Sequence, residues 1–126
     1  MTFSVSRIDH AVYWVKDVKR SRDFYMRMLG LQLVMCDSRV CLLRAQDSEQ
    51  HHDIGLFQTG SQAPRASSGT VGLYHIAWKV VTIEDLAQAL SLFQAEGFLV
   101  GASSHGATKS VYAHDPDGNE LEITFT

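Results

Sequence analysis

The chain carries one eight-residue pattern twice, as IDHAVYWV at residues 8–15 and as LYHIAWKV at residues 73–80. Each copy is rich in β-branched and aromatic residues, which predicts a strand. Each copy also has a histidine at its third position, His10 in the first and His75 in the second. The repetition therefore predicts two structurally equivalent modules.

A helix is predicted after each copy, because capping residues stand at both ends of an apolar stripe. In the first half Asp17 begins the helix and Gly30 ends it, and in the second half Thr82 and Gly97 do the same. Three short strand-like segments follow each helix, at residues 31–36, 39–45, 52–58, 98–103, 110–114 and 120–125. The predicted fold class is α+β, with two tandem βαβββ modules whose helices cover the outer face of a curved mixed sheet.

The length of 126 residues fits a single domain. We expect module one at about 6–58, a linker at 59–71 and module two at about 72–126. The linker is rich in Gly, Ser and Ala and contains Pro64, a composition typical of an exposed connection.

Composition excludes several classes of protein. The chain has 45% hydrophobic residues, a formal net charge of -3 and no basic run, which argues against a nucleic-acid partner. No apolar stretch approaches the roughly 20 residues that span a bilayer, and no signal-peptide core is visible, so a cytoplasmic protein is expected. Cys36 and Cys41 are predicted to be two reduced thiols on neighbouring strands.

Strand alternation and the repeat indicate where three potential metal ligands lie, namely His10, His75 and Glu122. Side chains alternate across a strand, so Glu122 lies opposite the apolar stripe of Leu121 and Ile123, on the side away from the helices. His10 and His75 occupy equivalent positions of the repeat, and pseudo-symmetric modules bring such positions together near their shared axis. Two histidines and one carboxylate match the facial triad of non-haem Fe(II) sites, which leaves coordination positions open.

Motifs in both halves resemble those of a known family. The first half has HAVYWV at residues 10–15, SRDFY at 21–25 and LGL at 29–31, and the second has HGATKSVYAHDPDGNELE at 105–122. The first set resembles the vicinal oxygen chelate superfamily, which includes glyoxalase I, bleomycin-resistance proteins and extradiol ring-cleaving dioxygenases. The second resembles the extradiol dioxygenase signature. The resemblance implies paired βαβββ modules around a central metal site.

The resemblance implies roles for six residues. The metal ligands would be His10, His75 and Glu122. The acid/base histidine would be His52, within HDIGL at residues 52–56, and Tyr112 and His105 would lie at the substrate and dioxygen pocket. Ser103, two residues before His105, departs from the signature, which usually has Gly, Asn, Thr or a branched aliphatic residue there.

Strand alternation adds an expectation for the histidines at the end of module one. His52 would share a face with Ile54 and Leu56 and be partly desolvated, which lowers the pKa of its imidazole. His51 is expected to point the opposite way, toward the surface. No role is assigned to His114.

The lead interpretation is a metal-dependent extradiol-type dioxygenase that cleaves a catechol-like vicinal diol with O2. Fe(II) is the expected cofactor, with Mn(II), Zn(II) or Ni(II) as alternatives. The partners would be a small aromatic or diol-like substrate and O2, with no membrane contact. A homodimer is expected, because familiar ring-cleaving members carry four modules.

Two alternatives stay open. A glyoxalase-like metal-dependent lyase or isomerase would take an extra Glu from the last strand of module one, and residues 53–58 contain none. A non-enzymatic small-molecule (antibiotic) binding protein would instead line a groove with Trp14, Trp78 and Tyr112.

Overall fold

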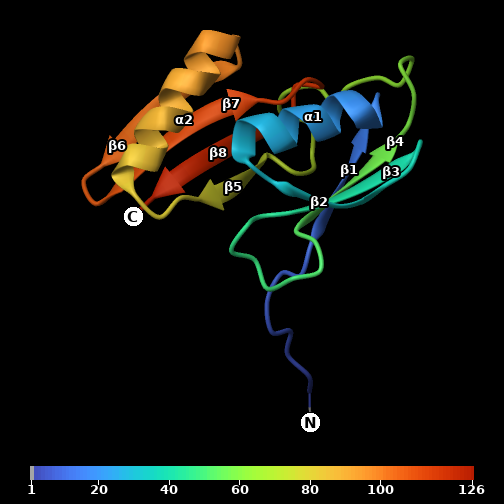
Figure 1. The fold of residues 1–126 in the computed structure, drawn as a ribbon, viewed down its shortest axis with the longest axis horizontal. Helices are drawn as coiled ribbons and strands as arrows, with labels where there is room; N and C mark the ends of the chain where they lie inside the picture. The colour runs from blue at the N-terminus through green and yellow to red at the C-terminus, as the bar shows by residue number, and fades with distance from the viewer. Residues whose placement is uncertain (1) are drawn as a thin grey trace. The chain divides into compact units, whose positions relative to one another are not determined.

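The computed structural model describes residues 2–126, and these residues form eight strands and two helices (Figure 1). In chain order the elements are β1 (Ala11–Val15), α1 (Val18–Leu29), β2 (Gln32–Cys36), β3 (Val40–Arg44), β4 (Ile54–Gln58), β5 (His75–Lys79), α2 (Ile83–Glu96), β6 (Leu99–His105), β7 (Thr108–His114) and β8 (Glu120–Phe125). The order βαβββ occurs twice, so the predicted α+β fold of two tandem modules is confirmed.

The chain divides into two compact units between Ala63 and Pro64. The division falls inside the segment 59–71 that was expected to be a linker. No helix among residues 2–126 is long and apolar enough to cross a membrane.

The first unit has a four-stranded sheet in the order β1-β4-β3-β2. The pair β1 and β4 is parallel and the other pairs are antiparallel. Helix α1 packs against β3 and β4, and the residues between them form the core of the unit, including Val15, Tyr25, Leu43 and Leu56. The other face of this sheet carries the alternate residues of each strand.

The second unit repeats this arrangement in the order β5-β8-β7-β6, with β5 and β8 parallel. Helix α2 lies over β6, β7 and β8 (Figure 1). Its Phe93 is fully buried, together with Val111, Ala113 and Leu121 of the sheet. Because these residues occupy one face, their neighbours along β7 and β8, including Tyr112 and Glu122, lie on the face away from the helix.

The helices begin and end where the capping residues predict. The Asp17 carboxylate accepts hydrogen bonds from the backbone nitrogens of Lys19 and Arg20, and the Thr82 hydroxyl accepts one from Asp85. Gly30 and Gly97 end the helices in the left-handed conformation, with φ of 69° and 81°.

Several strand boundaries differ from the prediction. β6 and β7 are longer than expected, because they form a hairpin in which His105 is paired with Thr108. In the first unit, β1 starts only at Ala11, so His10 lies immediately before the strand, whereas His75 is the first residue of β5.

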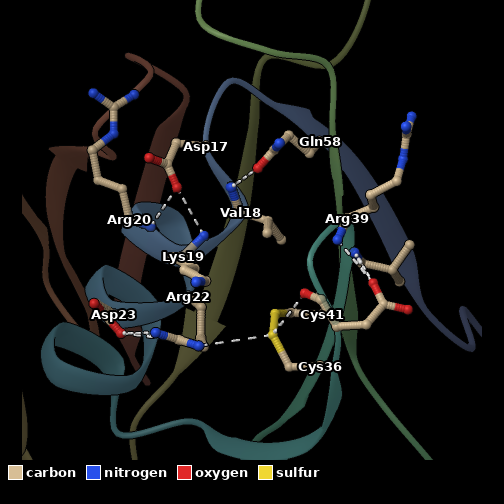
Figure 2. The surroundings of a disulfide bond; sticks show 12 residues. Asp17, Val18, Lys19, Arg20, Arg22, Asp23, Cys36, Arg39, Cys41 and Gln58 are labelled. Atoms are coloured by element: carbon tan, nitrogen blue, oxygen red, sulfur yellow. Dashed lines mark hydrogen bonds and ion pairs between the residues drawn. A yellow bond between two sulfur atoms is a disulfide. The ribbon is translucent and has the colours of Figure 1, made fainter.

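Cys36 and Cys41 form a disulfide (Figure 2), so the prediction of two reduced thiols is wrong. The cysteines do lie on neighbouring strands, directly opposite each other on β2 and β3 with their Cα atoms 4.1 Å apart. The Asp37 carboxylate holds the connecting turn by accepting from the backbone nitrogens of Arg39 and Val40. This register, which the spacing of two cysteines does not reveal, brings the sulfur atoms together.

Candidate metal centre and active site

His75 lies between two carboxylates on the open face of the second sheet. The parallel pairing of β5 and β8 places His75 opposite Glu120, one alternation away from Glu122. Nδ1 of His75 is 3.0 Å from Oε2 of Glu120, and Nε2 is 3.1 Å from Oε1 of Glu122. The ring is therefore held at both nitrogens.

Glu122 is held from its other side. The Ser110 hydroxyl on β7 donates a hydrogen bond of 2.6 Å to Oε2 of Glu122, and its oxygen lies 3.0 Å from Oγ1 of Thr124. Ser110 is buried, so little water competes with this bond. The carboxylate thus keeps one oxygen, Oε1, directed toward His75.

The donor atoms of this pair fit a divalent metal. Two adjacent ligands of an octahedral ion with bonds near 2.1 Å are separated by about 3 Å. The His75 Nε2 to Glu122 Oε1 separation of 3.1 Å matches that spacing. Within residues 2–126, no three His, Cys, Asp or Glu side chains gather as a complete ligand set.

Tyr112 belongs to the same face. It lies opposite Glu122 in the β7–β8 register, and its ring centroid is 6.4 Å from that of His75. Its hydroxyl is 3.0 Å from the hydroxyl of Ser103 on β6. Ser103, the position that departs from the extradiol signature, is therefore the residue that orients the phenol.

His105 is farther along the sheet. It is the exposed last residue of β6, four residues beyond Gly101, the residue paired with Tyr112. Four strand residues span about 13 Å. The structure does not bring His105 beside Tyr112, and a role for it remains a proposal.

In the first unit, His10 and His52 come together. They lie just before β1 and β4, whose parallel register pairs Ala11 with Ile54. The two imidazole centroids are 4.4 Å apart. Nδ1 of His10 is 2.7 Å from Oδ1 of Asp9, so the Asp9 carboxylate engages this nitrogen of the ring.

His52 is half-buried, and its environment disfavours the charged imidazolium. Burial lowers the pKa of His52, and the nearby His10 and His51 lower it further. His51 is exposed as expected, yet its Nδ1 lies 2.9 Å from Nδ1 of His52. The predicted lowering of the pKa is confirmed, and His51 proves to be part of its cause.

Four groups that contact the candidate residues received no such role in the sequence analysis. These are Asp9 beside His10, Glu120 beside His75, Ser110 beside Glu122 and Ser103 beside Tyr112. Alternation places Glu120 and Glu122 on one face, but only the strand register shows which side chains meet. His10 and His52 meet in one unit, and His75, Glu122 and Tyr112 meet in the other.

Comparison with known proteins identifies the family. The model of the Glyoxalase/Bleomycin resistance protein/Dioxygenase superfamily matches residues 7–123. The chain belongs to this superfamily. Membership confirms the resemblance inferred from the repeated histidine strands and from the DPDG segment.

Relatives within the superfamily include ring-cleaving enzymes. The chain is 31% identical over 119 residues to biphenyl-2,3-diol 1,2-dioxygenase 3 of Rhodococcus globerulus, covering 93% of this chain and 62% of that protein. It is 26% identical over 118 residues to catechol-2,3-dioxygenase of Bacillus subtilis, covering 94% of this chain and 41% of that protein. The chain thus spans less than two thirds of the length of these relatives.

Solved structures of the superfamily share the fold. Lactoylglutathione lyase from Agrobacterium tumefaciens superimposes with a TM-score of 0.71 at 17% identity, over 95% of this chain and 93% of that one. At this identity the likeness concerns the fold alone. The reaction must be inferred from the side chains described above.

Proposed function

We propose that this chain is a metal-dependent extradiol-type dioxygenase, which cleaves a catechol-like vicinal diol with O2. The observation that carries the proposal is the pair His75 and Glu122, spaced as adjacent metal ligands with Tyr112 on the same sheet face. The named activities of the Rhodococcus and Bacillus relatives support the same reaction class.

In this proposal the metal ligands are His10, His75 and Glu122, as the family resemblance implies. Imidazole and carboxylate donors suit Fe(II), and they also accept Mn(II), Zn(II) or Ni(II). A ferrous ion held by these three residues would have open coordination positions, and it would supply the chemistry that activates the diol and dioxygen.

Residues near the proposed ligands remove a substrate proton and donate a hydrogen bond to the substrate in this proposal. His52 takes a hydroxyl proton from the bound diol, because its lowered pKa keeps the imidazole neutral and able to act as a base near pH 7. Tyr112, oriented by Ser103, donates a hydrogen bond to an oxygen of the substrate. His105 has a secondary role at the pocket.

The overall change conserves both oxygen atoms of O2. The ring bond beside the diol breaks, and the two atoms enter the product as part of an aldehyde and a carboxylate. The proposal also includes a homodimer.

The glyoxalase-like alternative would require a further acidic ligand from the last strand of module one. Strand β4 has no glutamate. The nearest carboxylate, Asp53, is engaged by the backbone nitrogen of Ala45 and the hydroxyl of Ser48. The first unit therefore offers a histidine and a base, and no additional carboxylate from β4.

The test is metal content of protein purified without oxygen, followed by addition of catechol or 2,3-dihydroxybiphenyl in air. We expect stoichiometric iron and a yellow ring-fission product. Zinc, nickel or manganese without colour would favour the lyase or isomerase reaction, and protein without any metal would favour the binding protein.

Two variants test the division of roles. His52→Phe should retain iron and lose ring cleavage, because it removes the base and leaves the three ligands. Gln88→Phe changes an exposed residue of α2, on the helix side of the second unit, and is the control, with wild-type turnover expected. Loss of iron from His52→Phe would contradict the assignment of His52 as a base.

A further inference from the structure

Glu120 is the carboxylate closest to His75 that the proposed site does not use. It begins β8, directly opposite His75 in the β5–β8 register. Its Oε2 lies 3.0 Å from Nδ1 of His75, and its side chain is 19% exposed. Partial burial on both sides makes this contact a defined hydrogen bond and not a solvated surface pair.

The contact determines which nitrogen of His75 is available. An imidazole binds a metal through the nitrogen without a proton, and a hydrogen bond from the other nitrogen fixes the tautomer and the ring plane. Glu120 accepts from Nδ1, so Nε2 is the nitrogen that faces Oε1 of Glu122 at 3.1 Å. Nε2 of His75 and Oε1 of Glu122 would hold the metal in place of the Nε2 proton, and the Nδ1 bond to Glu120 would remain.

In the first unit a carboxylate also lies beside Nδ1 of the candidate ligand His10, but it comes from a different position of the repeat. Nδ1 of His10 is 2.7 Å from Oδ1 of Asp9, its neighbour in sequence. The residue at the repeat position of Glu120 is Asp53, and its carboxylate is bound elsewhere, to Ala45 and Ser48. The same nitrogen of both candidate ligands is therefore paired with a carboxylate, although the two carboxylates come from non-equivalent positions.

We propose that Glu120 is a positioning residue of the metal site. By accepting the Nδ1 hydrogen bond of His75, it holds the ring so that Nε2 and Glu122 present adjacent donor atoms to a divalent ion. The inference rests on the proposed metal site. Asp9 has the same role toward His10 with a smaller effect, because 69% of its side chain is exposed and water screens the interaction.

The experiment compares Mn(II) affinity, measured by electron paramagnetic resonance of the free ion, for four proteins. They are wild type, Glu120→Gln, Glu120→Leu and the control Glu49→Gln, which changes an exposed glutamate of the first unit. Loss of an orienting partner of a ligand typically weakens metal binding 10- to 100-fold. We expect a loss of that size for Glu120→Leu, a smaller loss for Glu120→Gln, which keeps an acceptor oxygen, and none for Glu49→Gln.

A second readout needs no metal. In the metal-free protein, the proton on Nδ1 of His75 should give a resolved NMR signal in wild type and in Glu120→Gln, and exchange too fast to observe in Glu120→Leu. Urea unfolding of each variant shows that the second unit stays folded. Should Glu120→Leu not fold, Glu120→Gln against wild type still provides both measurements.

Each other outcome overturns the inference. Wild-type affinity in Glu120→Leu would show that Glu120 does not position His75. Equal losses in Glu120→Gln and Glu120→Leu, with the Nδ1 signal unchanged, would make Glu120 a direct ligand. Absence of Mn(II) binding by the wild type would overturn the proposed metal site, and this inference with it.

Discussion

Replacing Ser110 with alanine should weaken divalent-metal binding about tenfold while leaving the second unit folded. The Ser110 hydroxyl donates to Oε2 of Glu122 at 2.6 Å, and only 4% of the serine is exposed. A hydrogen bond to a charged group contributes about 1.5–3 kcal/mol. Because the Glu122 side chain keeps 16% of its exposure, water replaces part of the bond, and the lower value of about 1.5 kcal/mol applies. That energy corresponds to roughly tenfold in a dissociation constant.

The assay is Mn(II) titration of metal-free protein, with the unfolding midpoint in urea measured in parallel. Ser104→Ala is the control, because Ser104 is exposed on β6 and accepts only from the Lys109 ammonium among the bonds described. We expect the same dissociation constant for the control and the wild type. A Ser110→Ala constant within twofold of wild type would refute the reasoning that this hydroxyl orients Glu122.

Three further perturbations probe the base, the phenol and a turn. In metal-free protein an NMR titration should give His52 a pKa below the ordinary value for histidine, because burial disfavours the imidazolium. The variant His51→Gln should raise this pKa. The unfolded chain then binds this proton more tightly, so the stability that His52 contributes is present above its ordinary pKa and is lost as pH falls through the lowered one. An unshifted titration would contradict the burial. Ser103→Ala removes the partner of the Tyr112 hydroxyl and should lower kcat/KM by about 1 kcal/mol, or roughly fivefold. Ser103→Thr should preserve the rate, and equal rates in all three proteins would exclude a role for this hydrogen bond. Gly118→Ala places a side chain at φ of 85° and should cost about 1–2 kcal/mol in urea unfolding, whereas an unchanged midpoint would show that the turn relaxes freely.

The repeat made the architecture predictable, because each module contains its own strand pattern, a helix N-cap residue and a glycine that ends the helix. Asp17, Gly30, Thr82 and Gly97 set the helix boundaries as expected, since each acts through its own backbone or the next turn. Alternation along β8 also placed Glu122 correctly, on the face away from the buried Leu121. Local sequence signals, which act over a few residues, were therefore sufficient to predict the helix boundaries and the sheet face of Glu122.

Interactions across strands were less accessible. The partners of Glu120, Ser110 and Ser103 depend on the register between neighbouring strands, which alternation along a single strand does not reveal. The same limit explains the disulfide, since Cys36 and Cys41 meet only because the β2–β3 pairing sets them opposite.

Strand alternation does not predict the environment of His52, because this residue lies outside the strand. Counting back from Ile54 and Leu56 put it on their face, yet those residues are buried beneath α1 while His52 contacts His10. The strand β4 begins only at Ile54, so the period of two does not extend to His52. The predicted lowering of the His52 pKa is nevertheless correct, because burial, together with the nearby His10 and His51, disfavours the imidazolium.

The parallel pairing of β5 with β8 has a consequence for folding kinetics. His75 and Glu120 are 45 positions apart, whereas the β6–β7 and β7–β8 hairpins connect residues that are close along the chain. Short loops close sooner than long ones, so the two hairpins should form before β5 joins the sheet. We therefore expect the His75–Glu122 pair to form after the rate-limiting barrier, so that a bound ion would stabilise the native state and not the transition state. Stopped-flow measurements should accordingly find that Mn(II) slows unfolding and leaves the refolding rate unchanged. The metal would then stabilise the folded second unit kinetically and would not nucleate its folding.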